Sequence, residues 1–103
     1  MNLNEYQDRT RTTAVYPNRK KEVDGLTYSI LGLCGEVGEL ANKLKKHHRA
    51  GTPIDVYVLA DELGDVMWYT ASVAFELGMP LEEVADMNLT KLALRAKEKA
   101  LVG

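Results

Sequence analysis

Apolar residues recur along the chain at intervals of three and four, the spacing that places them on one face of an α-helix. The clearest run lies between residues 56 and 77, where one face is formed by Val56, Leu59, Leu63, Val66, Met67 and Thr70. Turn residues separate four such segments, and we expect helices over about residues 4–14, 24–48, 53–77 and 80–99. The pattern predicts an all-α protein, a helical bundle of four helices in one domain spanning residues 1–103.

The connection after the second predicted helix carries specific end signals. Gly51 suits the position just beyond a helix end, and Pro53 follows it. Thr52 is expected to cap the third helix, with Pro53 as its first residue and Asp55 in the capping-box position. We interpret the adjacent His47 and His48 as part of a cationic helix end, which suits the negative end of the helix dipole.

Composition and charge narrow the function classes. The chain has 46% hydrophobic and 27% charged residues, as an ordinary globular domain does, and its net charge of −2 argues against a nucleic-acid binder. A single cysteine, Cys34, excludes an internal disulfide framework. The first residues lack an apolar leader segment, and no apolar run reaches about 18 residues. We therefore expect a cytoplasmic protein that does not bind membranes.

Acidic residues three apart are neighbours on a helix surface. Four such pairs occur: Glu5/Asp8, Glu36/Glu39, Glu62/Asp65 and Glu83/Asp86. The first and last pairs lie in first helical turns, where the helix dipole stabilises them. The two central pairs lie mid-helix beside apolar positions, and each has a glycine inside it. Like charges repel there and partial burial adds a desolvation cost, and a divalent cation would relieve both.

Oxygen-only ligands are typical of a hard cation rather than of zinc. We therefore expect Glu36, Glu39, Glu62 and Asp65 to be metal ligands, with Mg²⁺ as the cofactor and Mn²⁺ as a possible substitute. The alternative is that these acids are solvated surface groups paired with lysines. A ferritin-like carboxylate bundle that binds iron is a disfavoured alternative, because that architecture needs Glu-x-x-His pairs, which the sequence lacks.

Cationic and polar side chains accompany the acids on each predicted helix. The candidates for contacting an anionic substrate are Lys43, Lys46, Tyr69, Asn88, Lys91 and Arg95. Lys43 and Lys46 follow the first acidic pair along one side of its helix, and Tyr69 lies on the carboxylate side of the next. Asn88, Lys91 and Arg95 align on the fourth helix, so a basic face is available for phosphate oxygens.

The stretch GLCGEVGELANKLKK followed by DELGDVMWY resembles the ExxE…ExxD signature of the MazG-type, all-α nucleotide pyrophosphohydrolases. NLTKLALR is similar to the element on the last core helix of that family, so the resemblance covers most of the chain. It implies Mg²⁺-dependent hydrolysis of a nucleoside triphosphate, a deoxynucleotide or a non-canonical one, to monophosphate and pyrophosphate in a house-cleaning role. In that reading Glu39 takes the proton of the attacking water, and Lys91 stabilises phosphate charge.

Other substrates and assemblies stay open at this point. The same chemistry would serve dUTP or phosphoribosyl-ATP, and a non-catalytic helical interaction module is the alternative from another class. Relatives in the resembled family are dimers or tetramers. Trp68 and Phe75 lie on a different face from Leu59 and Leu63, and such second apolar faces often mark interfaces. We therefore expect a homo-oligomer, with a tetramer built from two dimers favoured over a dimer.

Overall fold

The computed structural model describes residues 1–16 and 22–102. The helices are α1 (Leu3–Thr10), α2 (Glu22–Ala50), α3 (Val56–Glu76) and α4 (Leu81–Val102), with a short 3₁₀ turn, η1 (Arg11–Thr13), after α1. The described residues form no β-strand. The prediction of four helices in an all-α protein is confirmed, and each predicted boundary lies within about three residues of an observed one.

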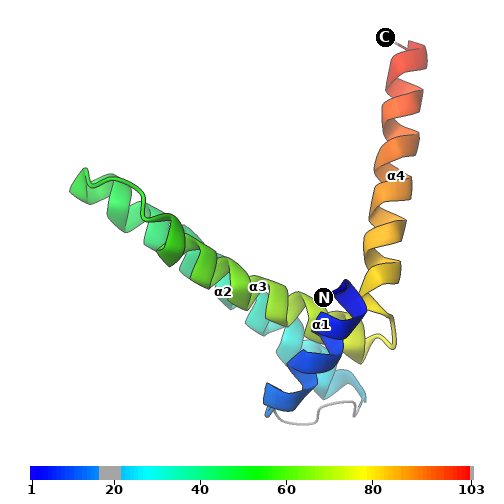
Figure 1. Cartoon of the computed structure of the whole chain (residues 1–103), viewed down its shortest axis with the longest axis horizontal. Coiled ribbons are helices and arrows are strands. Elements are labelled where there is room, and N and C mark those ends of the chain that lie inside the picture. Colours follow the sequence, from blue (N-terminus) through cyan, green and yellow to red (C-terminus); the bar gives the residue numbers. More distant parts are fainter. Residues whose placement is uncertain (17–21, 103) are drawn as a thin grey trace.

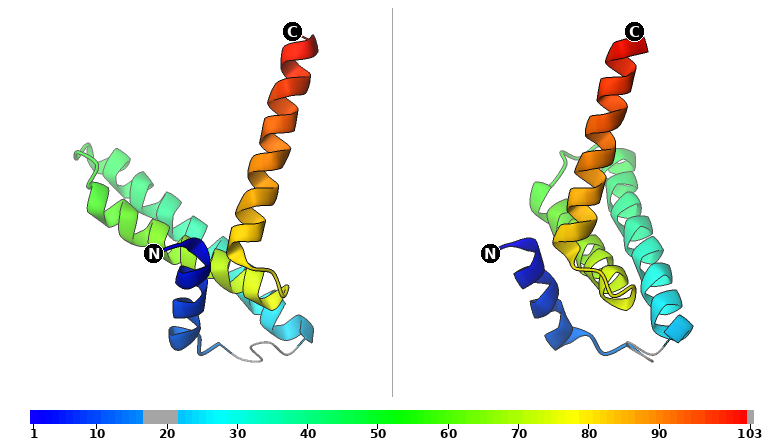
Figure 2. Two further views of the ribbon diagram at one scale, coloured as in Figure 1. Left: turned by 45° about the vertical axis from the view of Figure 1, so that its right-hand side comes forward. Right: turned by 90° about the vertical axis from the view of Figure 1, so that its right-hand side faces the viewer.

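α2 and α3 form a long antiparallel pair, and α1 lies against the end of this pair where α3 finishes (Figures 1 and 2). α4 starts beside α1 and then projects away from the other helices, so that its C-terminal end stands far from them (Figure 1). Within one chain the four helices therefore do not close into the expected bundle. None of the described helices combines the length and apolarity needed to cross a lipid bilayer.

α2 ends in a Schellman motif, in which a left-handed residue lets two amide groups turn back onto the last helical turn. Gly51 has a φ of 70°, and the Thr52 amide donates to the carbonyl of His47 at 3.2 Å. Asp55 caps α3, since its carboxylate accepts hydrogen bonds from the amides of the next turn. The prediction that Thr52 caps α3 is therefore wrong, because Thr52 is used to close α2 and the backbone becomes helical only at Val56.

Side chains of α1 satisfy the first amide groups of α4, which no turn of that helix can reach. The Leu81 amide donates to Oε1 of the buried Gln7 at 3.0 Å, and the Glu82 amide donates to Oδ1 of Asn4 at 3.0 Å. Gln7 Nε2 in turn donates to the Met79 carbonyl at 3.0 Å. This clamp fixes the direction in which α4 leaves the body.

The buried core is small and lies where α1, α3 and the start of α4 meet. Ala71, Ala74 and Leu81 form its centre, with Tyr6 and Val84 packed around them. Larger apolar side chains of α3 and α4 stay exposed, among them Met67 and the group Met87, Leu89, Leu92 and Leu94. A chain of this length normally buries more, so much of its apolar surface has no cover within the monomer.

Trp68 and Phe75, expected to lie at an interface, both have contacts within the chain and stay partly exposed, so their role in an interface stays a prediction. Trp68 Nε1 donates to Thr13 Oγ1 at 2.9 Å, and the Arg11 guanidinium lies 4.4 Å from the centre of the Phe75 ring. The segment that follows α1 therefore covers this face of α3 within the same chain. Sequence periodicity could not show this, because the covering residues lie more than 50 positions away.

Candidate metal and phosphate site

The candidate site lies along the seam between α2 and α3. We define the seam by the residues that meet there: Gly32, Glu36 and Lys43 of α2, and Glu62, Asp65 and Tyr69 of α3. Close approach at one end depends on Gly32, since a Cβ atom there would lie 2.1 Å from Tyr69 Cε1. Its neighbours Gly35 and Gly38 have open space around the same position. Only Gly32 of these three therefore has a packing reason within the described chain.

Three predicted metal ligands meet at the middle of the seam. One oxygen each from Glu36, Glu62 and Asp65 lies within 4.8 Å of the other two, a group that we call the carboxylate triad. Glu36 and Glu62 are partly buried, and Asp65 is exposed. Burial, followed by the charges of Asp65, Glu62 and Glu39, raises the pKa of Glu36 above its ordinary value. The triad thus holds unfavourable negative charge that a hard divalent cation fits by charge and by ligand type.

Glu39, the fourth predicted ligand, lies outside this group. It is exposed and lines a shallow cavity with Gly38, Asn42 and Lys45 on another side of α2. It still lies close enough to raise the pKa of Glu36. Its expected roles as a ligand and as the acceptor of the water's proton therefore stay predictions.

Lys43 connects the triad to a second feature of the seam. Its Nζ lies 4.0 Å from Oε1 of Glu62, and its side chain is 38% exposed. Such an exposed pair adds little stability, but it places a cation beside the carboxylates. Lys43 also lines an open cavity of about 310 Å³ together with Lys46, His47, Thr52 and Val58, which we call the cation pocket. Both lysines were predicted to contact an anionic substrate, whereas His47 was interpreted only as part of a cationic helix end.

Aromatic rings gather at the opposite end of the seam. Tyr69 packs edge-on against Trp68 with ring centres 5.0 Å apart, and Tyr16 stacks on Tyr28 at 5.5 Å. Tyr16 also meets Trp68 edge-on at 6.2 Å, so the four rings form one cluster. Burial, with the charges of Tyr28, Glu36 and Asp65, raises the pKa of Tyr69. Tyr69 therefore adjoins the triad as predicted, while Tyr16 and Tyr28 gave no sequence signal.

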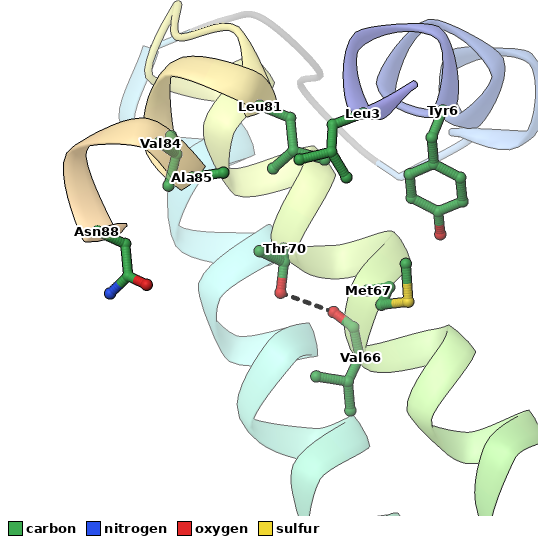
Figure 3. Close-up of a pocket in the computed structure, with 9 residues that line it drawn as sticks. All are labelled: Leu3, Tyr6, Val66, Met67, Thr70, Leu81, Val84, Ala85 and Asn88. Carbon is green, nitrogen blue, oxygen red and sulfur yellow. Dashed lines mark hydrogen bonds between the residues drawn. The ribbon is translucent and has the colours of Figure 1, made fainter. Parts of the chain in front are cut away.

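The three polar candidates on α4 are not brought to the triad of the same chain. Asn88 lines an apolar cavity of about 370 Å³ at the base of α4, and Tyr6, Val66 and Met67 also line this cavity (Figure 3). Lys91 and Arg95 lie on the exposed, projecting part of α4, and no ion pair joins them to the carboxylates among the described residues. Their alignment on one helix is therefore insufficient, because the clamp at the start of α4 directs that helix away.

The fold and this site define a class of all-α proteins that hold a cluster of acidic residues between two antiparallel helices. Residues 26–99 match the family described as the MazG nucleotide pyrophosphohydrolase domain. The chain is similar to the Gene 37 protein of Mycobacterium phage L5, with 38% identity over 109 residues that cover 100% of this chain and 96% of that protein. No solved structure gives a significant match. The chain belongs to the MazG nucleotide pyrophosphohydrolase family.

Proposed function

We propose that this protein hydrolyses nucleoside triphosphates to nucleoside monophosphates and pyrophosphate in the presence of Mg²⁺. The convergence of Glu36, Glu62 and Asp65 at the middle of the seam, within 4.8 Å of one another, carries the proposal. A cation and an aromatic side chain flank this triad, Lys43 on one side and Tyr69 on the other. The family match supports the same reaction class.

In the proposed reaction a water oxygen forms a bond to the α-phosphorus. The bond between that phosphorus and the oxygen bridging to the β-phosphate breaks, pyrophosphate leaves, and a proton of the water is released. A divalent cation bound at the triad would neutralise phosphate charge and polarise the α-phosphate. We expect Glu39, which is exposed and about one helical turn from Glu36, to accept the proton. Lys43 would neutralise a phosphate oxygen beside the triad.

The proposed substrates are free deoxynucleoside triphosphates or non-canonical triphosphates, removed in a house-cleaning role in the cytoplasm. The aromatic cluster at one end of the seam offers flat faces, and Tyr28 is 45% exposed. A base stacked there would leave the phosphates directed along the seam toward the triad. Base preference then depends on the shape of this cluster.

The test of this function is a screen for pyrophosphate release over common and modified nucleoside triphosphates with the full chain. We expect turnover with Mg²⁺ or Mn²⁺, no turnover with excess EDTA, and loss of turnover in Glu62→Gln and Asp65→Asn. Glu5→Gln is the matched control, because Glu5 is an exposed residue in the first turn of α1 and is not one of the residues that define the seam. Turnover that persists in excess EDTA would refute the metal site, and no turnover with any nucleotide would favour the interaction module.

We also propose that the protein is a homo-oligomer. Its accessible surface is 7542 Å², whereas a compact monomer of 11.5 kDa exposes about 5,800 Å². Its radius of gyration is 16.8 Å, against about 13 Å for a compact domain of this length. The excess of roughly 1,700 Å² per chain is the size that an obligate homodimer buries. A tetramer of two dimers, implied by the family resemblance, stays a prediction.

The uncovered surface has a definite location. The cavity at the base of α4 brings together Leu3, Leu81, Val84 and Ala85 (Figure 3). Farther along α4, Met87, Leu89, Leu92 and Leu94 are exposed apolar residues. A second copy packed along α4 would cover this surface, and it would provide the means for Lys91 and Arg95 to approach carboxylates of another chain. Light scattering should find no active monomer at micromolar concentration. A stable, fully active monomer would refute both parts.

A further inference from the structure

The basic residues of the cation pocket differ from the other basic residues near the end of α2 in lining one shared cavity. The helix dipole by itself explains why lysine and histidine are favoured in a last turn, whichever way they point. Lys45 lines a separate cavity with Glu39, and His48 is exposed. Lys43, Lys46 and His47 instead converge on one cavity, and its lining among the described residues includes no aspartate or glutamate.

The position of His47 follows from the helix and from the motif that ends it. His47 is eleven residues after Glu36, which at 3.6 residues per turn places it within about 20° of the same line along α2. The Schellman motif folds Thr52 back, so that Thr52 Oγ1 lies 3.1 Å from His47 Nδ1. This contact holds the imidazole ring at the cavity and leaves Nε2 as the nitrogen that can meet a ligand.

The pocket adjoins the triad along the seam. Glu62 contacts Lys43, and Val58, one helical turn earlier on α3, lines the pocket. The step from Glu62 to Val58 is about 6 Å along the helix, the scale of a diphosphate group. The seam thus presents aromatic rings, then carboxylates, then cations, in the order of a nucleoside triphosphate from its base to its last phosphate.

We propose that the cation pocket binds the β- and γ-phosphates of the substrate, the part that leaves as pyrophosphate. This inference rests on the proposed hydrolysis. It adds the orientation of the substrate along the seam and a preference for triphosphates over diphosphates. Lys46 and the His47–Thr52 pair are the specificity-determining residues, because they lie beyond Lys43 where only a third phosphate reaches. The protein should consequently discriminate between nucleoside triphosphates and the corresponding diphosphates.

Inorganic pyrophosphate is the probe, titrated into the full-length protein by calorimetry in the presence of Mg²⁺. We expect Lys46→Gln and His47→Gln each to weaken pyrophosphate binding about tenfold, since each removes a charge-assisted hydrogen bond. Lys45→Gln and His48→Gln are matched controls that change the same residue types one position away and outside the pocket. Both should bind pyrophosphate as the unaltered protein does. Thermal melts check that all four variants fold.

The second readout is the ratio of kcat/KM for a nucleoside triphosphate to that for its diphosphate. The ratio should fall about tenfold in Lys46→Gln and His47→Gln and stay unchanged in the controls. If triphosphates are hydrolysed but the pocket variants match their controls in both assays, the pocket assignment is overturned and the reaction stands. If no nucleotide is hydrolysed but the pocket variants alone lose pyrophosphate binding, the phosphate site is supported and the reaction is overturned. Absence of pyrophosphate binding in the unaltered protein would overturn the assignment.

Discussion

Replacing Glu36 with glutamine should have opposite effects on stability with and without a divalent cation. Each of the other two triad carboxylates has an oxygen within 4.8 Å of one on Glu36. Two unit charges at 4.8 Å repel by about 0.9 kcal/mol at the dielectric constant of water and by about 3.5 kcal/mol at an effective value near 20. Asp65 is exposed and Glu36 only partly buried, so the lower figure applies.

Removing two such repulsions should stabilise the metal-free protein by about 1–2 kcal/mol. For a domain of about 100 residues, each kcal/mol corresponds to roughly 4–8 °C in Tm. With Mg²⁺ at 100 times its dissociation constant, the unaltered protein gains about 2.7 kcal/mol, and the variant, which lacks one ligand charge, gains much less. The order of the two melting temperatures should therefore reverse between EDTA and Mg²⁺.

The assay is thermal unfolding of Glu36→Gln and of the unaltered protein in both conditions, at one protein concentration. Glu83→Gln is the control, because Glu83 is an exposed residue in the first turn of α4, where the helix dipole stabilises its negative charge. That variant should be slightly less stable, by about 0.3–1 kcal/mol, and equally so with and without Mg²⁺. A Glu36→Gln protein that melts below the unaltered protein in EDTA would refute the view that the triad stores repulsion. Equal Mg²⁺ shifts in both proteins would refute its role as a metal site.

Three further outcomes are expected. The pKa of Glu36 is raised in the folded protein, so its protonated carboxyl group adds stability that is complete below the ordinary glutamate pKa and is lost as the pH rises through the raised pKa. In urea unfolding with EDTA, the difference in unfolding free energy between Glu36→Gln and the unaltered protein should therefore grow as the pH rises across that window. Gly32→Ala should displace Tyr69 and lower both Tm and turnover. Gly35→Ala, which has open space around the added methyl group, should raise the unfolding free energy measured in urea by about 1 kcal/mol. Equal effects of the two substitutions would contradict the packing role of Gly32. Gln7→Leu should lower the unfolding free energy by about 1–3 kcal/mol, because it leaves a buried amide at the start of α4 without its acceptor, and an unchanged urea midpoint would contradict the clamp.

Local sequence determined the helices and the identity of most of the site. Helical periodicity and the turn residues Gly51 and Gly78 fixed where helices begin and end, because these signals act over a few residues. The acidic pairs were visible for the same reason. The alignment of Glu36, Lys43 and His47 on one line of α2 was also present in the sequence at helical spacing, and it marks His47 as a pocket residue.

Tertiary structure decided which of these helix faces meet. Glu36 joins Glu62 and Asp65, while Glu39 of the same helix lines another cavity. The packing of α2 against α3, close at Gly32 and Tyr69, determines which side of α2 faces the seam. The direction of α4 depends on Gln7, whose Oε1 accepts a hydrogen bond from the Leu81 amide, 74 positions later in the sequence. Periodicity within one helix carries no information about contacts between residues so far apart in the sequence. Only the folded chain, in which buried amides must find acceptors at any sequence distance, separates α4 from the triad and leaves its apolar side uncovered.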